Sequence, residues 1–218
     1  MDDKLFEDWK NQLKDYYYNL KESESLNINN LDLENTAICI IDLINGFTKE
    51  GPLSSERLKS VIPQIKELVQ FGYEKNIPMI AYKDCHSCDN IEFKVYPAHC
   101  IENTSESDLV EELKGYGIKE IPKMSTNGFI AQNTMDILKN NNIKNFIVVG
   151  GCTDICVHQY VLTLKTYMNE KNIDSRIIVP MNMVDTFELP HHNAELHNVM
   201  FLSSMISNGI EVVKEILY

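Results

Sequence analysis

Cys156 stands where a cysteine can become a nucleophile, shortly after a strand and two glycines. The apolar run Phe146–Val149 predicts the strand, and the glycines allow the tight turn that follows it. Thr153 or Asp154 could cap the next helix, which would put Cys156 in its first turn. Free backbone N–H groups and the helix dipole favour a thiolate there. The competing interpretation is a buried structural cysteine, since free cysteines are among the most buried residues.

A cysteine nucleophile needs a base, and Asp42 is a better candidate than His158, which would point to another helix face. The pKa of an ordinary aspartate lies ~4.6 units below that of a thiol, a gap of roughly 6 kcal/mol. The site must therefore raise the pKa of Asp42, lower that of Cys156, or both. Burial would do the first, and the helix terminus with the Lys123 ammonium would do the second.

Cysteine and histidine residues also gather at a spacing that suits a metal. Cys85, Cys88, His99 and Cys100 could form a structural zinc site, because Zn²⁺ is often held by such ligands. A redox pair of Cys85 and Cys88 would lack the usual strand-to-helix context. The position of Asp84 at the end of an expected strand counts against the structural zinc site.

Short apolar strands alternate with amphipathic helices along the chain. Strands are expected at Ala37–Ile41, Ile77–Tyr82, Ile118–Ile121, Phe146–Val149, Arg176–Val179 and Ile210–Val213. Helices are expected at Ser54–Lys75 with an irregularity at Pro63, and at Ser107–Gly115, Asn133–Asn140, Ile155–Met168 and His191–Ile206. This alternation predicts an α/β fold, in which helices cover both faces of a parallel sheet.

The candidate reactive residues follow four separate strands of this expected sheet. Asp42 ends the first strand, Asp84 follows the second, Lys123 the third, and Cys156 the fourth. In parallel sheets the chemistry lies beyond the carboxyl ends of the strands. We therefore expect the four side chains to meet at one edge of the sheet.

Residues 1–34 form a separate segment before the expected domain of residues 35–218. Trp9, Leu13, Tyr16 and Leu20 recur at helical spacing, and a tract rich in Ser and Asn, residues 21–30, reads as a linker. We expect a helical arm that packs against the domain or a partner subunit, so a homo-oligomer is compatible with the sequence.

Composition limits the possible partners and the compartment. A net charge of −12 argues against nucleic acid and anionic membranes, which need clustered Lys and Arg. The sequence shows neither a signal peptide nor an apolar run long enough for a membrane helix, so a cytoplasmic protein is expected. In a reducing compartment its six cysteines are better interpreted as core, metal or catalytic residues than as disulfides.

The sequence around the three candidate catalytic residues resembles the isochorismatase-like cysteine hydrolases. Asp42 in Ile-Ile-Asp-Leu, Lys123 in Ile-Pro-Lys-Met and Cys156 in Gly-Cys-Thr-Asp-Ile-Cys-Val match the family's Asp-Lys-Cys triad. The resemblance covers roughly residues 35–215. It implies a three-layer αβα fold around a six-stranded, mainly parallel sheet, and a thioester mechanism. True isochorismatases lack the cysteine, so its presence favours the amidohydrolase branch.

The segment from Asp84 to Cys100 resembles the metal loop of nicotinamidases. Asp84, His86 and His99 match that family's ligands, and Glu92 stands where many relatives carry a further His. The resemblance implies one divalent metal, with Zn²⁺ favoured and Fe²⁺ or Mn²⁺ compatible with carboxylate and imidazole ligands. It also reduces the weight of the structural zinc site.

The resemblance further implies how a substrate would sit. Phe47 and Tyr96 match the family's ring-contacting aromatics, and the metal would bind the pyridine nitrogen. The backbone N–H groups of Cys152 and Cys156 would hold the oxyanion, and the peptide bond Gly151–Cys152 would be cis. For each aromatic residue taken singly, core packing is the alternative.

The expected activity is hydrolysis of nicotinamide to nicotinate and ammonia, which would serve NAD salvage. One alternative is a cysteine hydrolase of another small amide or ureide, and another is a zinc-stabilised binding module without catalysis. The remaining histidines His191, His192 and His197 are expected to lie at the surface or at a helix start.

Overall fold

A computed structural model describes residues 3–132, 134 and 142–218 of the chain. The helix expected over residues 133–140 lies, apart from Thr134, outside them. In the described part of the chain, no helix has the length and apolar character needed to cross a membrane.

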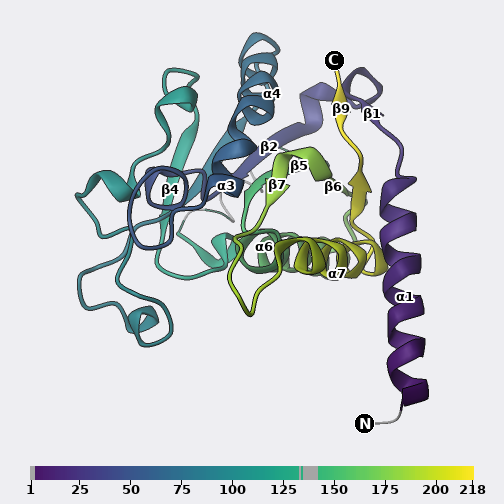
Figure 1. Cartoon of the computed structure of the whole chain (residues 1–218). Helices are drawn as coiled ribbons and strands as arrows, with labels where there is room; N and C mark the ends of the chain where they lie inside the picture. Colours follow the sequence, from purple (N-terminus) through teal and green to yellow (C-terminus); the bar gives the residue numbers. More distant parts are fainter. Residues whose placement is uncertain (1–2, 133, 135–141) are drawn as a thin grey trace.

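A parallel sheet forms the centre of the molecule (Figure 1). Its main strands lie in the order β4–β3–β2–β5–β6–β8, and the short β7 pairs with the end of β5. The bounds are β2 (Thr36–Ile41), β3 (Met79–Asp84), β4 (Lys119–Lys123), β5 (Asn145–Gly151), β6 (Arg176–Pro180), β7 (Val184–Asp185) and β8 (Glu211–Val213). The pairings within this sheet are all parallel. The predicted strands and their orientation are confirmed, with β7 as an addition.

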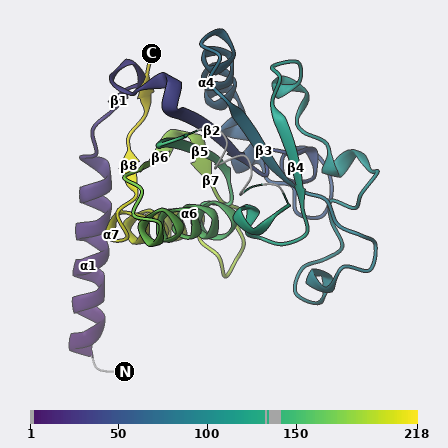
Figure 2. The same ribbon diagram turned by 180° about the vertical axis from the view of Figure 1, so that it is seen from behind.

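Helices cover both faces of the sheet and bury a separate apolar core on each side (Figures 1 and 2). Successive residues of a strand point to opposite faces, so Cys39 joins the core beneath α6 (His158–Glu170) and α7 (Ala194–Ser207). Its neighbours Ile38 and Ile40 join the core beneath α4 (Ile62–Glu74). The three-layer αβα architecture is therefore confirmed.

Pro63 divides the helix expected over Ser54–Lys75, as predicted. The chain forms α3 (Glu56–Ser60), then α4 (Ile62–Glu74) with Pro63 in its first turn, where a missing N–H costs nothing. Before α3 the chain forms the short helix α2 (Asn45–Thr48), and short 3-10 turns connect several elements.

The helix expected over Ser107–Gly115 is wrong. This segment instead forms the 3-10 turns η4 (Ser105–Ser107) and η5 (Glu111–Leu113), with extended residues between them. Leu109 pairs with Ile44 in an isolated bridge, and the carbonyl of Asp108 accepts the N–H of Asn45. These backbone contacts with the start of α2 require an extended chain, so tertiary pairing overrides the helical pattern.

The N-terminal segment contains the expected helix, but the tract after it is more than a linker. In α1 (Asp3–Lys21) only Leu20 is buried, and the first half of the helix extends beyond the body of the molecule (Figure 1). The following tract forms β1 (Leu26–Asn27), which pairs in parallel with β9 (Ile216–Leu217) near the C-terminus. Ile28 then enters the core with no exposed surface. The domain boundary at residues 34 and 35 remains a prediction.

Gly150 lets β2 and β5 come together where both strands approach their carboxyl ends. It pairs with Ile41, has a φ of 112°, and a Cβ there would lie 2.0 Å from the Ile41 carbonyl oxygen. Gly115 also has a positive φ, of 87°, but no atom lies within 4 Å of where its Cβ would be.

Substitutions at these two glycines distinguish the cost of backbone strain from the cost of a steric clash of the added Cβ. We expect Gly150→Ala to lower the free energy of unfolding by more than about 4 kcal/mol or to abolish folding, because it suffers both effects. Gly115→Ala suffers strain alone and should lose about 1–2 kcal/mol. Urea denaturation followed by circular dichroism measures both, and equal losses would contradict the packing described here.

Candidate active site and metal cluster

Asp42, Lys123 and Cys156 meet at the edge of the sheet formed by the carboxyl ends of its strands. Asp42 directly follows β2, Lys123 is the last residue of β4, and Cys156 lies in the turn η7 (Thr153–Val157) after β5. Their exposed fractions are 2%, 3% and 6%. Three distant parts of the chain thus join in one buried group.

The Lys123 ammonium lies at the centre of this group. Its Nζ atom is 2.7 Å from Asp42 Oδ2 and 3.9 Å from Cys156 Sγ, and it also donates to Asp84 Oδ1. The second oxygen of Asp42, Oδ1, accepts the backbone N–H of Asp84 at 2.9 Å. The two aspartates are therefore tied together through one cation and one backbone hydrogen bond.

Burial and neighbouring charge raise the pKa of Asp42 to about 6, because desolvation and the charge of Asp84 outweigh the Lys123 ammonium. This is the direction expected for a general base working near neutral pH. The expected lowering for the thiol is wrong, because burial raises the pKa of Cys156 well above its ordinary value despite Lys123. Cys156 therefore depends on a nearby base to accept its proton.

The loop that carries Cys156 differs from the predicted helix start. The peptide bond Gly151–Cys152 is cis, as the resemblance implied. The chain then forms a single π-helical turn, Thr153–Val157, before α6 begins at His158. Neither Thr153 nor Asp154 caps a helix, because the N-cap position is taken by Cys152, without a side-chain bond.

Asp84, His86, Glu92 and His99 form a second cluster beside the first. One ligand atom from each lies within 4.8 Å of those from the others. Asp84 Oδ2 is 3.6 Å from both His86 Nε2 and His99 Nε2, and His86 Nε2 is 3.3 Å from Glu92 Oε2. Ligand atoms about 2.1 Å from a tetrahedral ion would be separated by roughly 3.4 Å, so this spacing fits a divalent metal.

The protonation of the histidines supports the same assignment. His86 Nε2, which faces the carboxylates of Asp84 and Glu92, is buried without a hydrogen-bond partner, an arrangement that is costly unless an ion binds between them. His99 Nδ1 lies 2.8 Å from the carbonyl oxygen of Pro97, which can only accept, so Nδ1 can donate there while Nε2 faces Asp84. A histidine that ligates a metal commonly donates its other N–H in this way.

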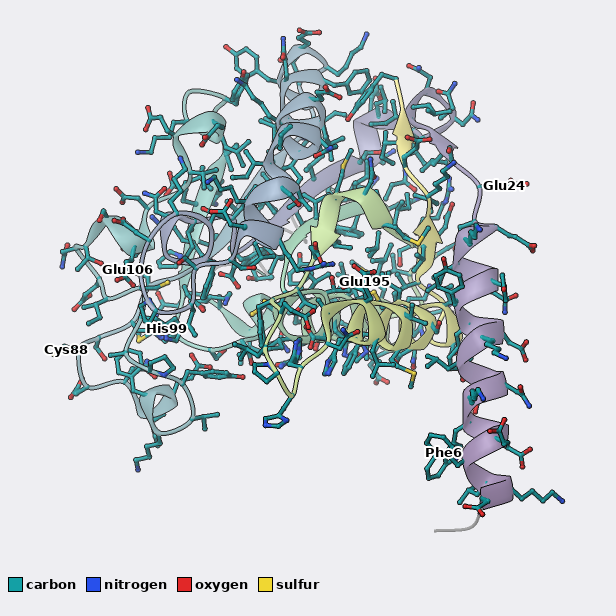
Figure 3. All side chains as sticks on the ribbon, viewed as in Figure 1. Phe6, Glu24, Cys88, His99, Glu106 and Glu195 are labelled. Carbon is teal, nitrogen blue, oxygen red and sulfur yellow. The ribbon has the colours of Figure 1, made fainter. Side chains whose placement is uncertain are left out.

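Among the described residues, the cysteines of the same loop form no metal-binding group with His99. Cys88 is exposed, Cys85 half-buried and Cys100 buried, and the backbone N–H of Cys100 donates to Glu106. Figure 3 shows Cys88 at the outer edge of this loop region. The structural zinc site weighed from the sequence thus receives no support from the geometry.

The two predicted ring-contacting aromatics both lie next to the metal cluster. The ring centroid of Phe47 is 5.6 Å from that of His99, and the ring of Tyr96 is 6.2 Å from it. The edge of a flat substrate bound at the cluster would therefore be within reach of aromatic side chains.

The sequence did not predict a third polar group, formed by Asp154, His192 and His197. His192 and His197 lie at the start of α7, one of the two expected positions, but they are only partly exposed and both contact the carboxylate of Asp154. His191 is exposed, as expected, and α7 begins after Asn193. The signal available in the sequence was Asp154 itself, an acidic residue two positions before Cys156 that was expected only to cap a helix.

Comparisons with known proteins agree with this arrangement. A family model described as the isochorismatase domain matches residues 36–208. Nicotinamidase 1 of Arabidopsis thaliana is 30% identical over 177 residues, which cover 72% of each chain. Two solved structures share the fold at low identity. Pyrazinamidase of Pyrococcus horikoshii, solved in complex with zinc, is 23% identical, with a TM-score of 0.70 over 82% of this chain and 98% of that one. N-carbamoylsarcosine amidase from Thermoplasma acidophilum is 20% identical, with a TM-score of 0.69 over 82% and 95% of the two chains.

The match to the family model spans most of the chain, and the cysteine that separates amidohydrolases from true isochorismatases stands in the matched region. The chain therefore belongs to the isochorismatase family, as a hydrolase of the nicotinamidase type that acts on an amide.

Proposed function

We propose that the chain hydrolyses nicotinamide to nicotinate and ammonia through a thioester on Cys156, and that it serves NAD salvage. The observation that carries the proposal is the contact between the two clusters. Asp84 bonds the Lys123 ammonium through Oδ1 and faces the histidines through Oδ2. A nucleophile thus lies beside a site that could hold a divalent ion, which suits an amide attached to a ring with a nitrogen donor.

In the first half-reaction Asp42 accepts the thiol proton while the sulfur of Cys156 attacks the carboxamide carbon and forms a C–S bond. Backbone N–H groups of Cys152 and Cys156 hold the oxygen that gains negative charge. Asp42 passes the proton to the amide nitrogen, the C–N bond breaks, and ammonia leaves. Lys123 stays protonated and balances the charge of the carboxylates throughout.

In the second half-reaction Asp42 takes a proton from water, whose oxygen attacks the thioester carbon. The C–S bond breaks, the sulfur regains the proton, and nicotinate is released. Because burial raises the pKa of the thiol, the sulfur depends on Asp42 to take its proton.

Asp84, His86, Glu92 and His99 would hold the metal, and zinc is the ion we propose. Once bound, it would supply Lewis-acid chemistry suited to a ring nitrogen donor. Phe47 and Tyr96 would contact the ring and direct the carboxamide toward Cys156.

The catalytic assignment predicts the effect of removing the sulfur. Cys156→Ala should lower kcat for ammonia release from nicotinamide by at least about a thousandfold, because nothing else can form the thioester. Cys88→Ser, at an exposed cysteine of the metal loop, is the matched control and should keep the wild-type rate. Wild-type ammonia release by Cys156→Ala would show that another residue is the nucleophile.

The metal assignment predicts that Glu92 contributes to affinity. Glu92→Ala should weaken Zn²⁺ binding to the metal-free protein at least about tenfold, as measured by isothermal titration calorimetry. Glu102→Ala, an exposed carboxylate after the same loop, should bind as the wild type does. Equal affinity for both variants would remove Glu92 from the ligand set.

The metal-free and zinc-loaded proteins also test whether nicotinamide is preferred as a substrate over other amides. Ammonia release from nicotinamide should fall with a chelator and return with Zn²⁺, and benzamide, which lacks the ring nitrogen, should be a poor substrate. Faster turnover of a small ureide by the metal-free protein would favour the alternative hydrolase.

A further inference from the structure

Asp154 lies inside the loop between Cys152 and Cys156, yet its carboxylate points to the segment that leads into α7. Its Oδ1 accepts the hydroxyl of Thr186 at 2.6 Å. Its Oδ2 is 2.7 Å from His192 Nε2 and 2.9 Å from His197 Nδ1. The side chain of Asp154 is 4% exposed, so these contacts lie away from bulk water.

His192 is held between two acceptors. Its Nδ1 lies 2.9 Å from the carbonyl oxygen of Phe187, which cannot donate, so Nδ1 carries a proton. Its Nε2 faces the carboxylate of Asp154. Although burial opposes ionisation, hydrogen bonds from Thr186 and His192 lower the pKa of Asp154, so the carboxylate is charged and also only accepts. Both ring nitrogens of His192 therefore lie within hydrogen-bond distance of an acceptor, the carbonyl of Phe187 on one side and the carboxylate of Asp154 on the other.

The distances distinguish this group from the metal cluster, although both combine histidine with a carboxylate. The two nitrogens stand 2.7 and 2.9 Å from Asp154 Oδ2, which is the length of a charge-assisted hydrogen bond. At Asp84 the matching separations are 3.6 Å. An ion between Asp154 and these histidines would push their atoms to roughly 3.4 Å apart. These short separations therefore indicate direct hydrogen bonds between Asp154 and the two histidines, with no ion between them.

We propose that His192 is a positioning residue for the reaction: the hydrogen bond from its ring holds Asp154, and through Asp154 it fixes the Cys152–Cys156 loop. The inference rests on the proposed function, since that loop carries the nucleophile and both proposed oxyanion donors. The ring of His192 also stacks on Phe187, with centroids 3.9 Å apart and an interplanar angle of 16°. The loop is thereby bonded to the chain that precedes α7, whose first residues lie near the labelled Glu195 (Figure 3).

This role should affect the chemical step and leave substrate binding unchanged. The proposed ring contacts, Phe47 and Tyr96, come from other segments of the chain and lie beside His99. A loosened loop misplaces the sulfur and the oxyanion donors, and small misplacements can cost up to about a hundredfold in rate. A variant without the hydrogen bond should therefore lose kcat while KM for the amide stays nearly constant.

Three variants of the full-length, zinc-loaded enzyme test the proposal. His192→Phe keeps a ring against Phe187 but cannot donate, and we expect kcat for nicotinamide to fall about tenfold or more with KM within twofold. His192→Gln can still donate to Asp154 and should recover most of the rate. His191→Phe makes the same change at the exposed neighbour and should behave as the wild type.

Hydrogen–deuterium exchange of the 152–157 segment tests the same variants without any substrate. Exchange should be about tenfold faster in His192→Phe and unchanged in His192→Gln and His191→Phe. If the wild type does not hydrolyse nicotinamide but the exchange pattern appears, the proposed function fails and the loop contact stands. Unchanged exchange in His192→Phe overturns the inference, as does a rate equal to the wild type. A second bound zinc that His192→Phe loses would also overturn it, because the group would then be a metal site.

Discussion

The buried ammonium of Lys123, held between the carboxylates of Asp42 and Asp84, is the interaction on which the site depends. Two carboxylates this deeply buried repel each other and cannot both stay ionised without a cation. Despite burial, the charges of Asp42 and Asp84 hold the pKa of Lys123 well above its ordinary value. Breaking such a pair from one side costs about 3–5 kcal/mol, because a buried charge is left without its partner. Lys123 is therefore required for the folded site before any chemistry begins.

The same contact explains how a base and a metal cluster can lie side by side. Asp84 divides its two oxygens, one to Lys123 and one to the histidines. Its ionised state is favoured from both sides, which holds its pKa well below the ordinary value although burial alone would raise it. Asp42, which feels burial and the charge of Asp84, is moved in the opposite direction. Two aspartates at the ends of adjacent strands thus differ in pKa because of where each faces.

The parallel sheet made much of this predictable from the sequence. Reactive residues after separate strands of such a sheet converge at its carboxyl edge, so Asp42, Lys123 and Cys156 could be grouped without coordinates. Other features depend on long-range contacts that no local pattern encodes. The segment around Leu109 is extended because it pairs with Ile44. Leu26 forms a strand because it pairs with Ile216, close to the C-terminus.

Charges at the site illustrate the same limit. The spacing around Cys156 indicated a helix terminus and hence a lowered thiol pKa, but the depth of burial, which raises it, is a property of the finished fold. The contacts of Asp154 with His192 and His197 could not be predicted from the sequence either, because they join residues 38 and 43 positions apart. The sequence predicts which residues have reactive side chains, while packing in the folded protein determines their pKa values and their hydrogen-bond partners.

The most direct measurement is intact-protein mass spectrometry of the enzyme quenched with acid during turnover of nicotinamide. The account predicts a species heavier by one nicotinoyl group, with the added mass on the peptide that contains Cys156. Ammonia release that proceeds with no acylated enzyme at any time would contradict it.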